Sequence, residues 1–161
     1  PFTGAHDALL PKFGPLFYEG DIVKVSSIAV RSTISNVLAE IEVQDISEAK
    51  DSFGVLVWSR ELPEGNGVAS MSELSAIEYQ TYQASHFLTS VNGVGEGQIN
   101  VCNEGGDIEI GDHISTSSVL GKGKCYDGFD TRLVVARAIE AVDWSQEINS
   151  IKTIACIYMC G

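Results

Sequence analysis

The chain has little of several features that define common protein classes. Its 161 residues include only 10 Lys and Arg against 22 Asp and Glu, a formal net charge of −12 at pH 7. Proteins that hold nucleic-acid backbones need clustered cations to neutralise phosphates, so we expect no nucleic-acid partner. No apolar run approaches the roughly 18 residues of a membrane-spanning helix, so we expect no membrane partner either. The hydrophobic fraction of 44% instead predicts a packed core.

Cysteine is also scarce. Cys102, Cys125, Cys156 and Cys160 are too few for a disulfide scaffold in a chain of this length. Cys156 and Cys160 lie four residues apart in a strand-like run, which separates them by about 13 Å at roughly 3.3 Å per residue. That is too far for one zinc ion, and the two-residue Cys spacing of zinc knuckles is missing. We therefore expect buried free thiols and neither a metal nor another cofactor.

The chain begins at Pro1 and has no charged-then-apolar leader. We expect a processed or excised piece of a longer protein, folded as a single domain over residues 1–161.

Alternating and β-branched patterns predict strands in most of the chain. They cover residues 20–30, 35–45, 52–60, 97–103, 106–115, 132–142 and 151–160. Short strands at regular spacing, separated by Gly turns, predict a mainly β fold, a small barrel or sandwich with one or two short helices.

Residues 70–88 have a different character and are either a helix or a loop. Ser70 or Ser72 is a possible N-cap, with Glu73 in reach of a capping box. Leu74, Ile77 and Tyr82 would then form the apolar stripe of the helix.

A weak internal repeat links the two halves of the chain. "GDIVKVSS" at 20–27 is followed by "FGVLVWSRE", and "GDHISTSS" at 111–118 is followed by "VVARAIEAV". In each half Gly-Asp opens a strand and Ser-Ser closes it. We predict two related β-motifs in one core, with Gly20-Asp21 and Gly111-Asp112 in equivalent turns.

The Gly- and Asp-rich stretch at 106–125 suggests three kinds of loop. A phosphate loop is disfavoured because "GKGKC" lacks the hydroxyl residue and precedes no helix. A calcium loop could use Asp107, Glu109 and Asp112, although the EF-hand spacing is absent. Turn chemistry, with Asp112 bonded to its own backbone, explains the Gly-Asp pairs more simply.

Covalent catalysis has few candidate residues. No G-x-S-x-G elbow is present, and the histidines are His6, His86 and His113. His6 and Asp7 are neighbours, but adjacent residues on a strand point to opposite faces. A structural role is the simpler interpretation of each histidine.

Several segments resemble the C-terminal chaperone and maturation domains of viral fibres, which occur on phage tail spikes, tail fibres and neck appendages and in large DNA viruses. They are "VGEGQINVCNEGGDIEIGDHISTSS", "GKGKC", "VVARAIEAVDW" and the opening "FTGAHDAL", and together they extend over nearly the whole chain.

The resemblance implies an intramolecular chaperone that trimerises at the end of an elongated fibre and aligns the upstream region of the same chain. It also implies self-cleavage at the N-terminal boundary, at or just before Pro1. His6 and Asp7 lie near that boundary and are the candidate catalytic residues; any enzyme activity would be this cleavage in cis. The expected location is the virion, or the host cytoplasm during assembly.

The alternative function is a retained fibre-tip head that binds a host receptor or glycan. Trp58, Tyr79, Tyr82 and Trp144 could stack on sugars, although each is equally suited to a core or interface.

The C-terminal run 151–160 is apolar at almost every position. We expect it either to be central in its own sheet or to present one face to a partner chain, because an exposed apolar edge strand promotes aggregation. Together with the fibre resemblance, this favours a homotrimer.

Overall fold

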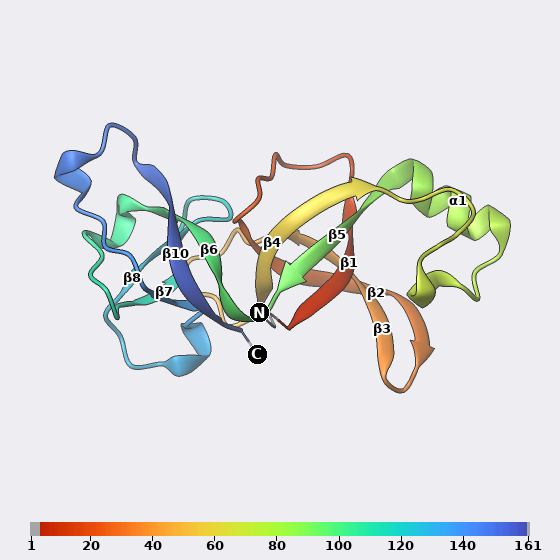
Figure 1. Ribbon diagram of the computed structural model, residues 1–161, viewed down its shortest axis with the longest axis horizontal. Helices are drawn as coiled ribbons and strands as arrows, with labels where there is room; N and C mark the ends of the chain where they lie inside the picture. Colours follow the sequence, from red (N-terminus) through yellow and green to blue (C-terminus); the bar gives the residue numbers. More distant parts are fainter. Residues whose placement is uncertain (1–3, 161) are drawn as a thin grey trace.

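The computed structural model describes residues 4–160 and consists of two small β-barrels side by side (Figure 1). The first barrel contains β1 (Ala5–Pro11), β2 (Ile22–Thr33), β3 (Asn36–Val43), β4 (Ser52–Glu61) and β5 (His86–Asn92). The second contains β6 (Val94–Cys102), β7 (His113–Thr116), β8 (Gly123–Tyr126), β9 (Ala136–Ala138) and β10 (Ile151–Met159). The helix α1 (Ala76–Ser85) and the short 3-10 turns η1 (Ala69–Met71), η2 (Asn103–Gly105), η3 (Thr131–Leu133) and η4 (Trp144–Gln146) complete the described elements.

The two barrels have the same topology. In each, the first strand pairs in parallel with the third, which pairs antiparallel with the second. The second strand pairs with the fourth, the fourth with the fifth, and the fifth closes the barrel against the first. The strand orders are β1-β3-β2-β4-β5 and β6-β8-β7-β9-β10. The mainly β fold of two related motifs is therefore confirmed.

The predicted Gly-Asp turns occupy equivalent positions, directly before β2 and β7. Gly20 and Gly111 have φ angles of 94° and 96°, which glycine adopts without steric cost. Asp21 and Asp112 each accept a hydrogen bond on Oδ2 from the N–H three residues earlier, at 2.9 and 2.8 Å. Asp112 is thus bonded to the backbone of its own turn, at a residue that precedes it and not at one that follows it.

The same turns bind the fourth strand of each barrel in the same way. Gly20 N–H donates to the Leu56 carbonyl at 2.7 Å, and Gly111 N–H to the Ala138 carbonyl at 2.8 Å. Leu56 and Ala138 then donate back to the carbonyl of the turn aspartate at 2.9 and 2.8 Å. This repeated hydrogen-bond pattern supports an internal duplication.

The helix begins later than the sequence suggested. Its N-cap is Ser75 and the capping box uses Glu78, so the predicted N-caps Ser70 and Ser72 and the predicted Glu73 are wrong. Ser70 lies in η1 instead.

The predicted stripe of the helix is also wrong at Ile77, which is 77% exposed, whereas Tyr79 is buried. Leu74 and Tyr82 do pack against the core cluster that contains Tyr79.

The C-terminal strand β10 is central in its sheet. It pairs with β6 along its whole length and with β9 at its C-terminal end. Ile154, Cys156 and Tyr158 point into the second barrel and are buried. The first of the two alternatives for this run is therefore correct, and the strand needs no partner chain to cover it.

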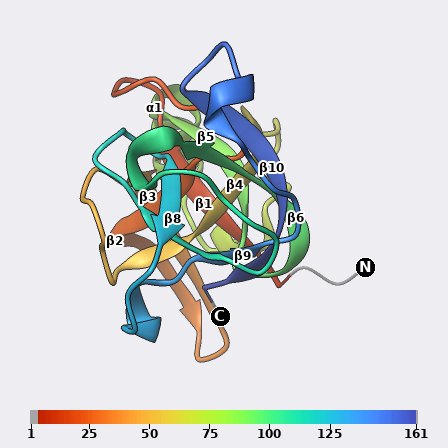
Figure 2. The same ribbon diagram turned by 90° about the vertical axis from the view of Figure 1, so that its left-hand side faces the viewer.

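A buried ion pair joins the barrels. Asp21, which is 1% exposed, accepts hydrogen bonds from Lys122 Nζ at 2.7 Å and Asn100 Nδ2 at 2.9 Å, both from the second barrel. Ile22 and Val55 of the first barrel belong to the same buried cluster as the core of the second. The core of the second barrel therefore extends into the first, whose other core residues form separate clusters. Figure 2 shows the two barrels end-on.

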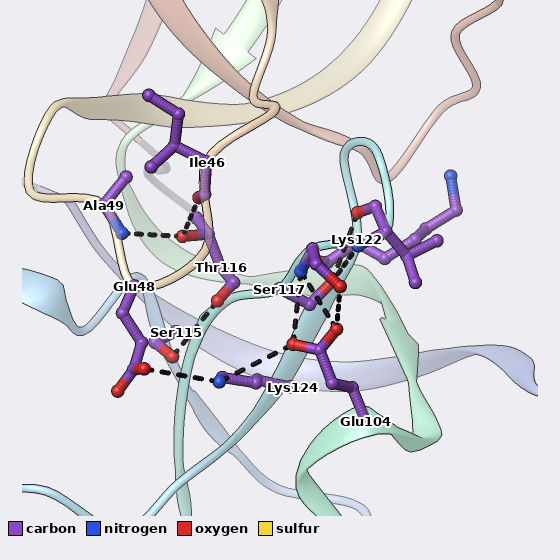
Figure 3. A network of polar contacts seen from close by, with 11 residues as sticks. Ile46, Glu48, Ala49, Glu104, Ser115, Thr116, Ser117, Lys122 and Lys124 are labelled. Carbon is purple, nitrogen blue, oxygen red and sulfur yellow. Dashed lines mark hydrogen bonds and ion pairs between the residues drawn. The ribbon is translucent and has the colours of Figure 1, made fainter.

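A second set of contacts fastens the β3–β4 loop to β7 (Figure 3). Thr116 Oγ1 accepts from Ala49 N–H at 2.8 Å and donates to the Ile46 carbonyl at 2.7 Å. Glu48 N–H donates to the Thr116 carbonyl at 3.0 Å, and the Glu48 carboxylate lies 3.4 Å from Lys124 Nζ. The loop is thereby held against the second barrel at several points.

We expect Asp21→Ala to lower the free energy of unfolding by about 3–5 kcal/mol, because it leaves the buried Lys122 ammonium without its counter-charge. Urea-induced unfolding measures this change. The control is Glu61→Ala, which removes an ion pair with Lys12 whose carboxylate is 67% exposed and should cost less than about 1 kcal/mol. Equal losses in the two variants would contradict the central role of Asp21.

Candidate functional site

The predicted residues His6 and Asp7 lie on β1 and both line one hollow of about 460 Å³. The opposite wall is the β2–β3 hairpin, which projects from the first barrel in Figure 1. The remaining lining residues are Ala5, Val25, Ile28, Ser35, Asn36, Val37, Ala39, Phe53 and Ser70. The hollow thus combines one imidazole and one carboxylate with a largely apolar wall.

His6 has an aromatic neighbour but no catalytic partner. Its ring lies 5.0 Å from the Phe53 ring, centroid to centroid, at an interplanar angle of 30°. Within residues 4–160, neither the His6 nor the Asp7 side chain makes a hydrogen bond or an ion pair. The structure therefore brings both residues to one hollow but does not assemble a nucleophile–base pair there. The expected scissile boundary at Pro1 lies outside the described residues.

The site lies near the junction between the two barrels, where the N-terminal and C-terminal ends of residues 4–160 come close together. Gly93, which links β5 to β6, donates its N–H to the Gly4 carbonyl at 3.2 Å. Its own carbonyl accepts from Cys160 N–H at 2.8 Å. The residue before β1 and the residue after β10 are therefore both hydrogen-bonded to Gly93, the link between the barrels.

The hairpin wall is unusually apolar for an exposed surface. The pairing of β2 with β3 is interrupted by three register shifts, between positions 25 and 33. Each bulge breaks the alternation of inward and outward side chains, so consecutive residues 25–28 are all exposed. Val25, Ile28 and Val37 are 38%, 37% and 50% exposed, and Ile34 at the hairpin tip is fully exposed.

A second polar group, not foreseen from the sequence, lies at the C-terminal end of α1. His86 Nε2 is 2.6 Å from Glu40 Oε1, and His86 Nδ1 is 2.7 Å from Ser85 Oγ. Ser27 Oγ donates to the other Glu40 oxygen at 2.9 Å. The neighbouring Ser85 and His86 were visible in the sequence, whereas Glu40 is 46 residues away.

This line of hydroxyl, imidazole and carboxylate resembles a catalytic triad, but its surroundings suit a structural role. Ser85 Oγ also donates to the Thr81 carbonyl in the last turn of α1, at 2.8 Å. The negative end of a helix favours a protonated imidazole and would repel a developing oxyanion. All the bonds are satisfied together when His86 carries both ring protons.

The pKa of Glu40 reflects the same contacts. Burial alone would raise it, but the hydrogen bonds from His86 and Ser27 and the nearby His86 charge bring it below its ordinary value of 4.5. Glu40 is therefore ionised at neutral pH.

The cysteines are not candidate nucleophiles. All four are free; Cys102 and Cys156 are buried, and Cys125 and Cys160 are partly buried. Burial raises the pKa of Cys156 to about 12 and that of Cys160 to about 11. Burial, together with the Asp112 charge, raises the pKa of Cys125 to about 11. Protonated thiols are poor nucleophiles and poor metal ligands.

Asp107 and Asp112, two acidic residues of the 106–112 stretch, accept hydrogen bonds from backbone N–H groups. Asp107 Oδ1 accepts from Trp144 N–H at 2.9 Å, and Asp112 closes its own turn. Within residues 4–160 no group of three or more His, Cys, Asp or Glu side chains is placed to hold a metal ion.

The four aromatic residues considered for sugar stacking are engaged within the protein. Trp58 is covered by the Arg60 guanidinium, 4.5 Å from the ring centroid, and Tyr79 is 4% exposed. Tyr82 Oη donates to a β2 carbonyl at 3.4 Å, and Trp144 Nε1 donates to a carbonyl before β7 at 2.9 Å. They do not form an open stacking platform.

Comparison of the chain with protein-family models, with curated proteins and with solved structures finds no match. Among the described residues, no helix combines the length and apolar character needed to cross a bilayer.

Because its pKa is lowered on folding, Glu40 stabilises the protein above the ordinary pKa of 4.5, and this contribution is lost as the pH falls through the folded-state value. We expect Glu40→Gln to cost about 1 kcal/mol at neutral pH, and the difference from wild type to shrink as the pH falls below 4.5 and through the lower folded-state pKa. Urea unfolding at neutral pH and at successively lower pH values measures it. The exposed Glu42 on the same strand provides the control, since Glu42→Gln should have little effect at any of these pH values. A pH-independent loss in Glu40→Gln would contradict the role of its charge.

Proposed function

We propose that this chain is a trimerising assembly module, the C-terminal chaperone of an elongated viral fibre. Three copies associate, align the chains that precede them and set the register of the fibre. The observation that carries the proposal is the apolar hairpin wall beside His6 and Asp7. The resemblance of the sequence to fibre maturation domains supplies the biological setting.

The net negative charge of the chain opposes self-association, so an apolar contact is needed to bring copies together. Copies that each carry −12 repel one another, so they associate only around a substantial apolar contact. Val25, Ile28, Val37 and the tip residue Ile34 provide exposed apolar side chains on one projecting arm. Exposed apolar patches of this kind mark interaction surfaces in soluble proteins.

Charge complementarity supports a contact between copies at the same place. Arg31 is exposed and lies directly opposite Val37 in the hairpin ladder, so the two side chains share a face. Among the described residues Arg31 makes no ion pair, and the same holds for Asp7 at the other side of the hollow. The hairpin tip of one copy can therefore place Arg31 against Asp7 of the next while Ile34 enters the hollow. Val37 belongs to the apolar wall of that hollow.

A cyclic arrangement follows from this head-to-tail contact. Heterologous contacts close into rings when the rotation between copies allows it. A ring of three matches the symmetry of a fibre and raises the local concentration of the three upstream segments, which lowers the entropic cost of pairing them.

Self-cleavage is the second part of the proposal. It would occur in cis near the start of the chain, with His6 as the proton acceptor and Asp7 nearby. Within residues 4–160 no hydroxyl or thiol is hydrogen-bonded to His6.

We expect the chain to have three times its 17.3 kDa mass at micromolar concentration and neutral pH, measured by light scattering. Val37→Asp should convert it to a monomer because a carboxylate in the apolar contact is costly to desolvate. Ile148→Asp is the matched control, since Ile148 is fully exposed in the second barrel and should not affect the mass. A wild-type chain that stays monomeric would rule out the proposal.

A charge exchange tests the pairing across copies. Arg31→Glu and Asp7→Arg should each weaken association, because each places like charges together, and the double variant should restore it. Arg137→Glu changes another exposed arginine, on β9, and should have only the small effect of added net charge. Sedimentation of the four variants measures how strongly each one associates. If the double variant is weaker than either single variant, the Arg31–Asp7 contact is wrong even where the apolar contact holds.

A further inference from the structure

A second hollow, of about 540 Å³, lies between the loop that precedes α1 and one face of the helix. Its volume is within the roughly 300–1,000 Å³ of small-molecule sites. Residues 76, 79, 80 and 83 form the helical wall, at the spacing of one helix face. The complete lining is Glu64, Gly65, Asn66, Leu74, Ala76, Tyr79, Gln80 and Gln83, and none of these residues belongs to the hollow that contains His6.

Asn66 in this lining has a left-handed backbone and an unpartnered acceptor. Its φ angle is 51°, a conformation that Asn adopts more readily than most non-glycine residues. Its Nδ2 donates to the Met71 carbonyl at 2.8 Å, which fixes the orientation of the amide. Its Oδ1 is buried and, alone among the buried side-chain polar atoms of residues 4–160, has no hydrogen-bond partner. A buried acceptor without a donor is costly, so the site gains stability from any ligand that supplies one.

The other lining groups determine which donor fits. Gln83 Nε2 is bonded to the Leu62 carbonyl at 3.2 Å, which leaves its Oε1 available as an acceptor. Gln80 adds a second amide with no bond to another described residue. Leu74 contributes apolar surface to the same lining.

The charge of the lining disfavours anionic ligands. No Lys or Arg lines the hollow, and Glu64 together with the net charge of −12 repels phosphates and carboxylates. Amide groups both donate and accept hydrogen bonds, and hydroxyl groups do the same. A neutral ligand with several hydroxyls and an apolar face therefore matches the lining best.

We propose that this hollow binds one neutral sugar unit, with a hydroxyl donating to Asn66 Oδ1 and others bonded to the amides of Gln80 and Gln83. The apolar face of the sugar ring packs on Leu74. This binding does not rest on self-association and uses none of the aromatic stacking that the sequence suggested. It gives the chain a recognition function in addition to assembly.

The test is an NMR titration of the intact, uniformly ¹⁵N-labelled chain with the methyl glycosides of glucose, galactose, mannose and N-acetylglucosamine at millimolar concentrations. One of these should shift the backbone amides of Gly65, Asn66, Ala76 and Gln80. Gln80→Ala keeps a good helix former on the helix, and Asn66→Gly keeps the left-handed backbone. Each variant should weaken binding about tenfold, as expected for one lost hydrogen bond in a desolvated site.

Controls separate this outcome from its alternatives. Thr81→Ala changes the same helix outside the lining and should leave the affinity unchanged. Nα-acetyl-lysine methyl ester tests whether Glu64 instead selects a cationic amine. The proposal is overturned if no glycoside shifts these amides, if the amine shifts them and the glycosides do not, or if Gln80→Ala and Asn66→Gly bind as tightly as Thr81→Ala.

Discussion

The salt bridge between Asp21 and Lys122 is the constraint on which the rest of the structure depends. Its carboxylate closes the turn that starts β2, and the same group holds the ammonium and the Asn100 amide of the other barrel. Two close-packed glycines make room for it. A Cβ on Gly20 would lie 2.7 Å from Asn100 Oδ1, and one on Gly121 would lie 2.9 Å from the Asp21 carboxyl carbon. One residue thus serves local turn geometry and the interbarrel contact together, so neither can change independently.

The duplicated scaffold explains where the functional surfaces lie. Both halves use the same strand order and the same Gly-Asp turn, and the second barrel keeps strands of only three or four residues at β7, β8 and β9. The first barrel extends the equivalent hairpin to strands of 12 and 8 residues and inserts α1 between its last two strands. Both hollows described above are formed by these additions. The common barrel core supplies stability, and the additions form the two hollows at which we propose binding.

The sequence predicted β2, β3, β4, β6, β10 and the duplication because these are local patterns. It missed β1, β5 and β8, and the strands expected over 106–115 and 132–142 are confined to the short β7 and β9. Alternation around Val37 and Ile41 and the repeated Gly-Asp pairs needed no knowledge of distant contacts. The start of the helix was missed because Ser70 and Ser75 are both followed by a Glu three positions later, so packing, not the capping pattern, selected Ser75. The approach of Glu40 to His86 across β1, and the bulges that expose Val25 and Ile28, depend on strand pairing between remote segments. No local signal encodes either of them.

The hydrogen bonds on either side of Gly93 have a mechanical consequence. They place the start of β1 and the end of β10 at one point, so a pull on the two ends of the described chain bypasses the interior of both barrels. The load falls first on the outermost ladder pairs, Ala5 with Asn92 and Met159 with Val94. Antiparallel strands loaded at one end separate one pair at a time, and the force at each step is that of a few hydrogen bonds. Under tension β1 and β10 therefore separate from their neighbours progressively, starting at the ends nearest Gly93. The rupture force is lower than that of a fold whose two chain ends lie on opposite sides of the molecule.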